Sequence, residues 1–190
     1  MTWEEVKKIT CQKMFYGEDE LDEIQKELMI SSCNEALKLI TLGGKKIRKQ
    51  HEIIKENNFE KDYNLRDEIE NFYQLEKVLY KEDETKNKTE NIQYRLEGEE
   101  TLSLCKLGIY TICYYAYPKK VTDSTSDTYE FELDEEAMML IPIYMAGQLI
   151  ADDDLTQSTM LKNEFEARRE ELKNATSTTK QSSITAVYSM

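Results

Sequence analysis

The sequence lacks the long hydrophobic runs that mark membrane proteins. No stretch of its 190 residues approaches the ~18 consecutive apolar residues of a membrane-spanning helix. The opening residues MTWEEVKK carry an amphipathic pattern where a signal peptide has an apolar core. We therefore expect no membrane association and a protein that stays in the cytoplasm of the cell that makes it.

Histidine is almost absent, and the four cysteines are irregularly spaced without a C-x-x-C pair. Zinc needs about four clustered ligands, so we predict no metal site. The other metal-like feature is Asp152-Asp153-Asp154, but three adjacent carboxylates cannot all face one ion from a helix. A tight turn that ends in a helix cap at Asp154 explains them better. We expect reduced, mostly buried thiols at Cys11, Cys33, Cys105 and Cys113.

Catalytic signatures are also missing. No nucleophile, base and orienting group can be assembled from the sequence, and no Gly-rich phosphate loop follows a predicted strand. The lone His51 falls in a stretch with strand spacing, where an exposed strand residue is the simpler interpretation. We predict that the protein is not an enzyme and holds no cofactor.

Positive charge is scarce, because 25 Lys and Arg residues face 38 Asp and Glu residues, for a net charge of −13. Binding to phosphates depends on Lys and Arg displacing counterions, and no basic patch with interleaved aromatic residues is present. The net charge therefore counts against ordinary nucleic-acid affinity. A large net charge of this kind can serve only to keep the protein soluble. An acidic protein can also lie beside DNA when its function is to let DNA pass without binding it.

The chain is organised around the stretch Asp134–Asn174, which predicts two helices separated by the Asp152–Asp154 turn. The first helix is apolar nearly all round, so it must be buried on most sides. Pro142 gives no N–H to the residue four positions back, and the helix should kink or restart there. We expect this hub helix to pack through Leu140, Ile141, Pro142, Tyr144 and Leu149.

The second helix of this stretch is amphipathic. Leu161, Phe165 and Leu172 form one apolar stripe, and charged residues cover the rest. Glu164 and Arg168 make an i,i+4 pair in the favourable order. The prediction is a buried hub helix docked to an amphipathic helix.

Two helical regions open the chain. Thr2 and Glu5 form a capping box, and Gly17 is the expected stop of the first helix. A second helical region runs from Glu20 to Leu42. The sequence SCNE at Ser32 is another capping box, so this region is either one helix or two helices that meet at Ser31.

The middle of the chain has strand spacing. The stretch Ile109–Tyr117 carries apolar residues on both faces, as a central strand does, whereas Asp62–Leu65 resembles a turn. The resulting fold class is α+β. We predict a helical core domain of residues 1–44 and 130–174, an antiparallel β insertion of residues 45–129, and a flexible C-terminal arm of residues 175–190. The other predicted strands are Lys45–Lys55, Leu75–Tyr80, Ile92–Leu96 and a short one around Leu102 and Leu104.

The Ser/Thr-rich end of the chain has two interpretations. It is a frayed terminus, or it is an arm that becomes ordered on a partner protein. The second interpretation rests on the β-prone residues Ile184, Val187 and Tyr188, which we name as candidate partner-binding residues.

Several motifs of the chain follow one another in a recognisable order. TWEEVKKITCQKMF and NEALKLI lie near the start, and LIPIYMAGQLIADDD followed by LKNEFEARREELKN lies near the end. These motifs resemble the opening and closing helices of a known family, the head-tail connector (adaptor) proteins of tailed bacteriophages and prophages. YRLEGEETLSL and a tyrosine-rich strand ending in Ala-Tyr-Pro are similar to the β-inserted members. The resemblance spans nearly the whole chain and departs from the family pattern at Gly147 and in the polar loop Lys81–Asn91.

The resemblance implies a structural virion protein. Its copies would form a homo-oligomeric ring, a dodecamer, beneath the portal protein at the phage neck, after synthesis in the cytoplasm of the bacterial host. A stopper or tail-completion protein would lie on the other side, and the C-terminal arm would reach the portal. DNA would pass through the ring without sequence-specific binding. An acidic lumen would then repel phosphate and let the DNA slide.

Two alternatives stay open at the level of sequence. One is another neck or tail-completion protein of a phage or a phage-tail-like particle. The other, from a different class, is a cytoplasmic regulatory module that binds a protein through its helical bundle.

Overall fold

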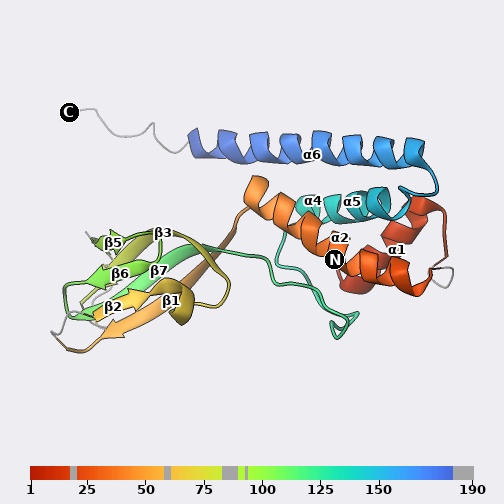
Figure 1. The fold of residues 1–190 in the computed structure, drawn as a ribbon. Helices are drawn as coiled ribbons and strands as arrows, with labels where there is room; N and C mark the ends of the chain where they lie inside the picture. The colour runs from red at the N-terminus through yellow and green to blue at the C-terminus, as the bar shows by residue number, and fades with distance from the viewer. Residues whose placement is uncertain (18–20, 58–60, 83–89, 93, 182–190) are drawn as a thin grey trace. The chain divides into compact units, whose positions relative to one another are not determined.

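The computed structural model describes residues 1–17, 21–57, 61–82, 90–92 and 94–181. It contains helices and antiparallel sheets, which confirms the predicted α+β class. The chain divides into two compact units. The helical unit consists of Met1–Lys46 and Pro118–Met190, and the β unit consists of Ile47–Tyr117 (Figure 1).

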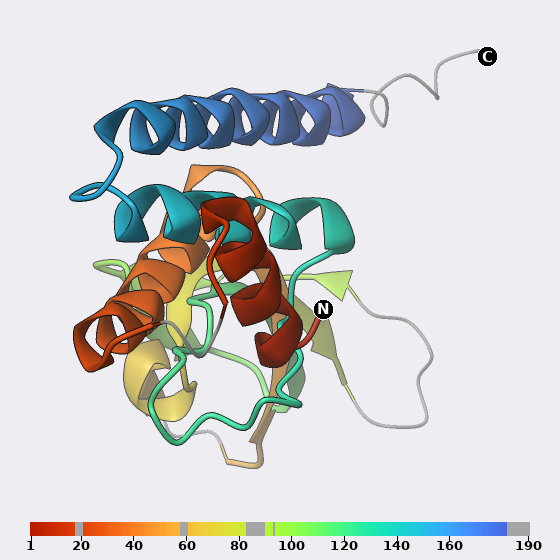
Figure 2. The same ribbon diagram turned by 90° about the vertical axis from the view of Figure 1, so that its right-hand side faces the viewer.

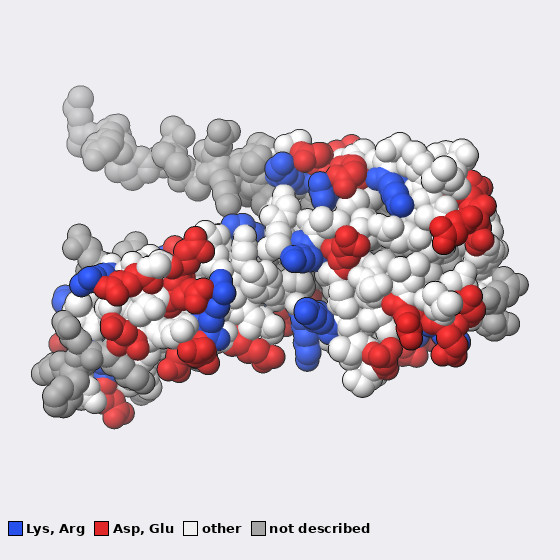
Figure 3. All heavy atoms as spheres, viewed as in Figure 1, with Lys and Arg blue, Asp and Glu red and all other residues white. Residues whose placement is uncertain are grey.

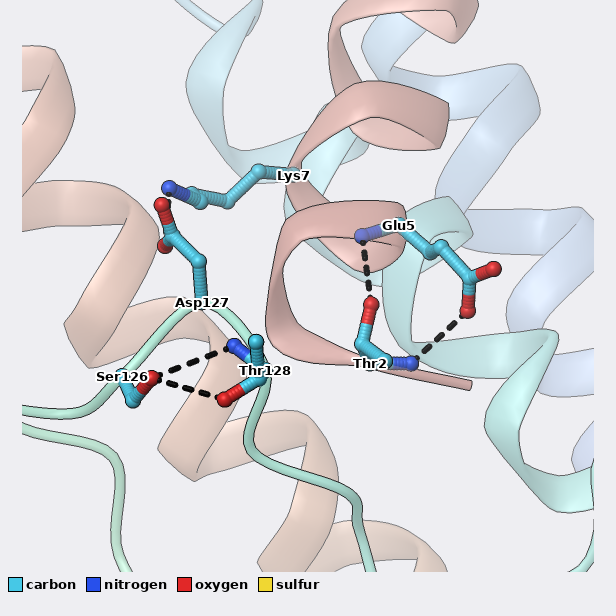
Figure 4. Close-up of polar contacts among 6 residues, drawn as sticks. All are labelled: Thr2, Glu5, Lys7, Ser126, Asp127 and Thr128. Atoms are coloured by element: carbon cyan, nitrogen blue, oxygen red, sulfur yellow. Dashed lines mark hydrogen bonds and ion pairs between the residues drawn. The ribbon is translucent and has the colours of Figure 1, made fainter.

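Helix α1 (Trp3–Met14) begins with the predicted capping box. The Glu5 N–H donates to Thr2 Oγ1 over 3.2 Å, and the Thr2 N–H donates to Glu5 Oε2 over 2.8 Å (Figure 4). The prediction that Gly17 stops this helix is wrong. Phe15 takes the left-handed conformation, with φ 63°, and the N–H of Tyr16 donates to the carbonyl of Cys11. This bond completes the helix end before Gly17 is reached.

Helix α2 (Glu23–Gly43) is one continuous helix, capped by reciprocal bonds between Asp22 and Gln25. The capping box at Ser32 is not used, because the Ser32 hydroxyl instead donates to the carbonyl of Leu28 over 2.6 Å. An unbroken buried stripe runs through this point and keeps the helix whole. The stripe consists of Met29, Cys33, Ala36, Leu37 and Ile40.

The hub consists of a short helix α4 (Glu135–Met138) and helix α5 (Leu140–Leu149). Asp134 caps α4 by accepting the Ala137 N–H over 3.1 Å. The expected interruption takes the form of a restart at Met139, three residues before Pro142. Pro142 therefore lies in the first turn of α5, where a missing N–H leaves no helical hydrogen bond unmade.

Helix α6 (Leu155–Gln181) begins at Asp154, whose Oδ1 accepts the Gln157 N–H over 2.9 Å. Glu164 and Arg168 form the predicted ion pair, at 2.7 Å. The helix continues beyond Asn174, so the prediction that a flexible arm begins at residue 175 is wrong for residues 175–181. Extending an existing helix costs far less than starting one. The proposed contacts Ile184, Val187 and Tyr188 lie outside the described residues.

Helix α5 lies between α6 on one side and α1 and α2 on the other (Figures 1 and 2). A Cβ atom on Gly147 would lie 3.3 Å from the Cβ of Leu161, so α5 and α6 approach closely there. Each large apolar side chain buried in this layer contributes about 1.5–3 kcal/mol. The five hub residues of the prediction are all buried: Leu140, Ile141, Pro142, Tyr144 and Leu149.

The segment after the last strand belongs to the helical unit. The N–H of Trp3 donates to the carbonyl of Tyr129 over 2.9 Å, and Lys7 pairs with Asp127 at 2.7 Å (Figure 4). The Asn34 side chain bonds both the N–H and the carbonyl of Val121. The bond from Trp3 satisfies a donor that the start of α1 leaves open, and the other contacts hold the segment against α1 and α2. The β unit therefore ends at residue 117, and the predicted end of the β insertion at residue 129 is too late.

The β unit contains two antiparallel sheets. The strand order is β1–β7–β3–β4 in the larger sheet and β2–β6–β5 in the smaller one. Strand β7 lies between β1 and β3, as predicted for a central strand. The strands are β1 (Ile47–Lys55), β2 (Lys61–Asn64), β3 (Phe72–Lys81), β4 (Glu90–Asn91), β5 (Arg95–Glu97), β6 (Thr101–Leu104) and β7 (Gly108–Ala116), with the short helix α3 (Leu65–Glu68) after β2.

Two local predictions in this unit are wrong. The expected turn at Asp62–Leu65 is the end of β2, which pairs with β6, followed by the first residue of α3. Strand β5 begins at Arg95, later than the predicted strand Ile92–Leu96. In β7 one face is buried from Tyr110 to Ala116, whereas on the other face Cys113 alone is buried among the described residues. His51 lies on β1 opposite Ile112 and is partly exposed.

Candidate functional site

Asp153, Asp154 and Cys33 could suggest a metal site or a reactive thiol, but their side chains have structural roles. Among the residues that the structure describes, no group of three or more His, Cys, Asp or Glu side chains could hold a metal ion. Asp153 accepts a hydrogen bond from the Tyr16 hydroxyl at 3.1 Å, and Asp154 caps α6. Burial raises the pKa of the Cys33 thiol to about 12, which keeps it protonated and unreactive.

Within the described ranges, no helix is both long and apolar enough to cross a bilayer.

A hollow of about 720 Å³ opens beside the C-terminal half of α2 and the C-terminal part of α6. Leu39 and Leu42 give it an apolar lining. We call this feature the basic groove, because four cations stand there against two carboxylates. Its charged residues are Lys38, Lys120, Arg169 and Lys173 against Glu35 and Glu170.

Three chain segments build the basic groove. A Cβ atom on Gly44 would lie 3.2 Å from the Cα of Lys173, so the absent side chain lets the end of α2 approach α6. The bonds of Asn34 to Val121 hold the segment that contributes Lys120 against α2. The groove thus depends on contacts between residues that are distant in sequence.

Part of the charge in the groove is already neutralised. Arg169 pairs with Glu166 at 2.6 Å, and Lys173 pairs with Glu170 at 3.2 Å. The side chains of Lys38 and Lys120 form no ion pair with any described residue. These two amino groups are therefore available to carboxylates from outside the chain.

The groove wall is tied to the hub through Tyr144. Burial, followed by a hydrogen bond with Glu35, raises the pKa of the Tyr144 hydroxyl to about 12. The tyrosine ring packs on Phe165 of α6, with the ring centroids 4.8 Å apart. A predicted hub residue thus connects α5 to both helices that form the groove.

A second surface, which we call the apolar end, consists of Phe15 after α1 and Leu155 at the start of α6. Their exposed fractions are 85% and 73%. Gln157 Nε2 donates to the carbonyl of Lys13 at 2.9 Å, and the Tyr16 hydroxyl donates to Asp153 at 3.1 Å. Because these bonded residues flank Phe15 and Leu155 in sequence, the two exposed side chains lie at the same end of the helical unit.

Acidic residues lie next to the apolar end. Asp152, Asp153 and Asp154 form the turn immediately before Leu155. In Figure 3 acidic side chains gather at the end of the helical unit where α6 begins. The apolar end and the basic groove therefore carry opposite charge.

Phe15 combines exposure with backbone strain. A bulky residue in the left-handed region costs roughly 1–2 kcal/mol, and Gly or Asn usually takes this position at a helix end. With 85% of its surface exposed, the side chain gains little from packing within the chain. No role for Phe15 was predicted from the sequence. The available signal was the absence of Gly or Asn directly after the last apolar position of α1.

The two surfaces of the helical unit are the features from which a function can be argued. Both combine apolar side chains with a charged rim, as protein-binding surfaces do. Neither surface was predicted from the sequence, in which the candidate contacts are Ile184, Val187 and Tyr188. No protein-family model matches the chain, and no curated protein is significantly similar to it in sequence.

Proposed function

We propose that this protein is a head-tail connector (adaptor) at the neck of a tailed phage or prophage particle. One observation carries the proposal. The segments that resemble the family, TWEEVKKITCQKMF, LIPIYMAGQLIADDD and LKNEFEARREELKN, form α1, α5 and α6, and they pack together around the hub. The resemblance therefore follows one folded core and is not scattered over unrelated surface segments.

The proposal includes a finer view of the fold, in which a helical bundle carries an inserted β domain and a C-terminal arm. Ile47 pairs with Ala116 in register at the base of the larger sheet. The chain therefore enters and leaves the β unit at neighbouring positions, as an insertion into a helical domain requires. This supports the assignment of the chain to the β-inserted type.

The proposed assembly is a dodecameric ring in the virion, bound to the portal protein on one side and to a stopper or tail-completion protein on the other. The presence of two surfaces of opposite charge on the helical unit supports a role in protein assembly. The net charge of −13 supports a DNA conduit that does not retain DNA. A ring whose lumen is lined by basic residues would contradict the conduit role.

Binding to the portal is the decisive measurement. The purified chain would be mixed with the portal ring encoded by the same genome and examined by co-sedimentation and electron microscopy. We expect an added ring of density on one face of the portal. A portal that remains bare at micromolar chain concentrations and moderate salt would overturn the proposal.

The arm is tested separately, by removal of residues 182–190, which leaves α6 complete. We expect portal binding to be lost while the circular dichroism spectrum is unchanged. A sharper variant replaces Ile184, Val187 and Tyr188 with serine, and Thr185→Ser is its matched control. Unchanged portal binding by the triple variant would remove the arm from the proposal.

A regulatory module that binds a cytoplasmic protein is the second candidate, since exposed Phe15 and the basic groove also suit a single partner. Mass spectrometry of purified virions separates the two functions. An adaptor is present in finished particles, whereas a regulatory module is found in the cell lysate alone. A tail-completion protein would instead be present on tails made by a capsid-defective mutant.

A further inference from the structure

We infer that the apolar end of one copy of this chain docks into the basic groove of a second copy. The partner is another molecule of the same protein, and the contact is head to tail. The two surfaces are argued from the helical unit alone. The role of the contact as the repeated interface of a ring rests on the proposed function.

The apolar end has the properties of an interface anchor. Aromatic residues that become fully buried on binding dominate the energetics of many interfaces. Phe15 holds a strained backbone conformation and exposes 85% of its surface, and Leu155 at the same end of the helical unit exposes 73%. Neither exposed side chain stabilises the isolated chain by burial, so a binding role accounts for both.

The basic groove complements this anchor in chemistry and in size. Leu39 and Leu42 supply apolar contact, and a hollow of about 720 Å³ accommodates an aromatic side chain with its neighbours. The side chains of Lys38 and Lys120 lack ion-pair partners among the described residues, and the Asp152–Asp154 turn would supply carboxylates next to the inserted anchor. Opposite charges at the rim fix the orientation in which two copies meet.

The charge of the whole chain favours this pairing over others. Two copies with a net charge of −13 repel each other in most orientations. The basic groove is a local exception, and the acidic apolar end is the surface that it attracts. The chain thus carries both halves of one complementary contact.

The positions of the two surfaces make the contact head to tail. Leu155 and Arg169 are separated by about 21 Å along α6, at 1.5 Å per residue. The apolar end therefore cannot fill the groove of its own chain, and each copy can engage two neighbours at once. A heterologous contact of this kind closes into a ring or extends into a filament, depending on the rotation between copies.

The test is analytical ultracentrifugation of the full chain over a range of concentrations. We expect wild type to associate beyond a dimer, and we expect high salt to weaken the association. Phe15→Asn keeps a residue that accepts the left-handed conformation. Lys38→Glu puts a carboxylate in place of a groove cation that forms no ion pair with any described residue. Each should weaken association by about 30-fold or more, as the loss of a central anchor does. Met160→Ser, which removes an exposed apolar side chain elsewhere on α6, is the matched control and should associate like wild type.

Mixing the two variants gives the decisive result. Phe15→Asn retains an intact groove and Lys38→Glu retains an intact apolar end, so the mixture can form one functional contact. We expect heterodimers and no larger species. A wild type that stays monomeric at every concentration would overturn the inference, as would variants that associate normally or a mixture that does not dimerise.

Portal binding, measured in parallel, separates this inference from the proposed function. A chain that binds the portal but shows no contact between the apolar end and the groove contradicts the inference alone. A chain that associates through these surfaces but never binds its portal contradicts the proposed function alone.

Discussion

At the scale of single residues, Phe15 shows a local conflict between sequence and conformation. We predict that Phe15→Asn raises the free energy of unfolding of the monomer by about 0.5–1 kcal/mol, because Asn accepts the left-handed region more readily. Urea denaturation at low protein concentration measures this change. Phe15→Ala keeps the backbone penalty and should bring no gain. A loss of stability in the Asn variant would mean that the aromatic ring packs within the chain.

The Arg48–Glu76 pair crosses the larger sheet. Arg48 Nε donates to Glu76 Oε2 at 2.6 Å, and the Tyr115 hydroxyl donates to Glu76 Oε1 at 3.2 Å. The hydrogen bond from Arg48 is the main cause that lowers the pKa of Glu76. Burial, followed by the charge of Glu76, raises the pKa of Tyr115. The three side chains join β1, β7 and β3.

The sign of the resulting pH dependence follows from the lowered pKa. Glu76 stabilises the folded state above its unfolded pKa, and this contribution disappears as the pH falls through the lower folded pKa. Arg48 is largely exposed, so we predict that Glu76→Gln costs about 0.5–1 kcal/mol near pH 7. Urea denaturation should show that the difference from wild type vanishes in acid. Glu52→Gln, on the exposed face of β1, is the control and should be neutral.

At the scale of elements, α5 is the helix on which the others depend. Ile141 is fully buried, whereas 37% of the surface of Met139 is exposed. We predict that Ile141→Ala lowers the free energy of unfolding by about 2–4 kcal/mol, and that Met139→Ala costs less than about 1 kcal/mol. Trp3, the single tryptophan, packs on Phe131 in the same core, so its fluorescence reports on this unit. Equal effects of the two variants would contradict the hub role.

The junction of α5 and α6 depends on one buried hydroxyl. Ser158 Oγ donates to the carbonyl of Gly147 at 2.7 Å, whereas the Thr159 hydroxyl makes a similar bond to Leu155 at the surface. We predict that Ser158→Ala costs about 1–2 kcal/mol, because a buried acceptor loses its partner. Thr159→Ala should change stability by less than about 0.5 kcal/mol, since water replaces the lost bond. Thermal denaturation compares the two, and equal costs would argue against a special role of the buried bond.

Local signals explain which elements the sequence predicts well. The Thr2–Glu5 box and the Asp154 cap use residues three apart, so their sequence pattern is sufficient. The Ser32 box has the same pattern but is overridden, because its helix is packed along an unbroken buried stripe. The basic groove escaped prediction for a further reason. The groove unites Lys38, Lys120 and Arg169 from three segments, and no periodicity in the sequence encodes such a meeting.

At the scale of the whole molecule, the two units have separate cores. Ile47 and Ala116 are paired neighbours, so a short linker can join Lys46 to Pro118. We predict that replacement of residues 47–117 by a Gly-Ser linker leaves the helical unit folded, with its core around α5 retained. Circular dichroism and Trp3 fluorescence during urea denaturation measure this. A shortened chain without a cooperative transition would show that the helical unit needs the β unit to fold.

The pairing of Ile47 with Ala116 also has a consequence for the history of such chains. One in-frame recombination event between the codons for Lys46 and Pro118 can add, remove or exchange the entire β unit without touching a codon of the helical core. Selection can then act on the β unit and on the helical core independently. Related genes should therefore differ most abruptly at these two codons, with similar helices flanking dissimilar or missing middles.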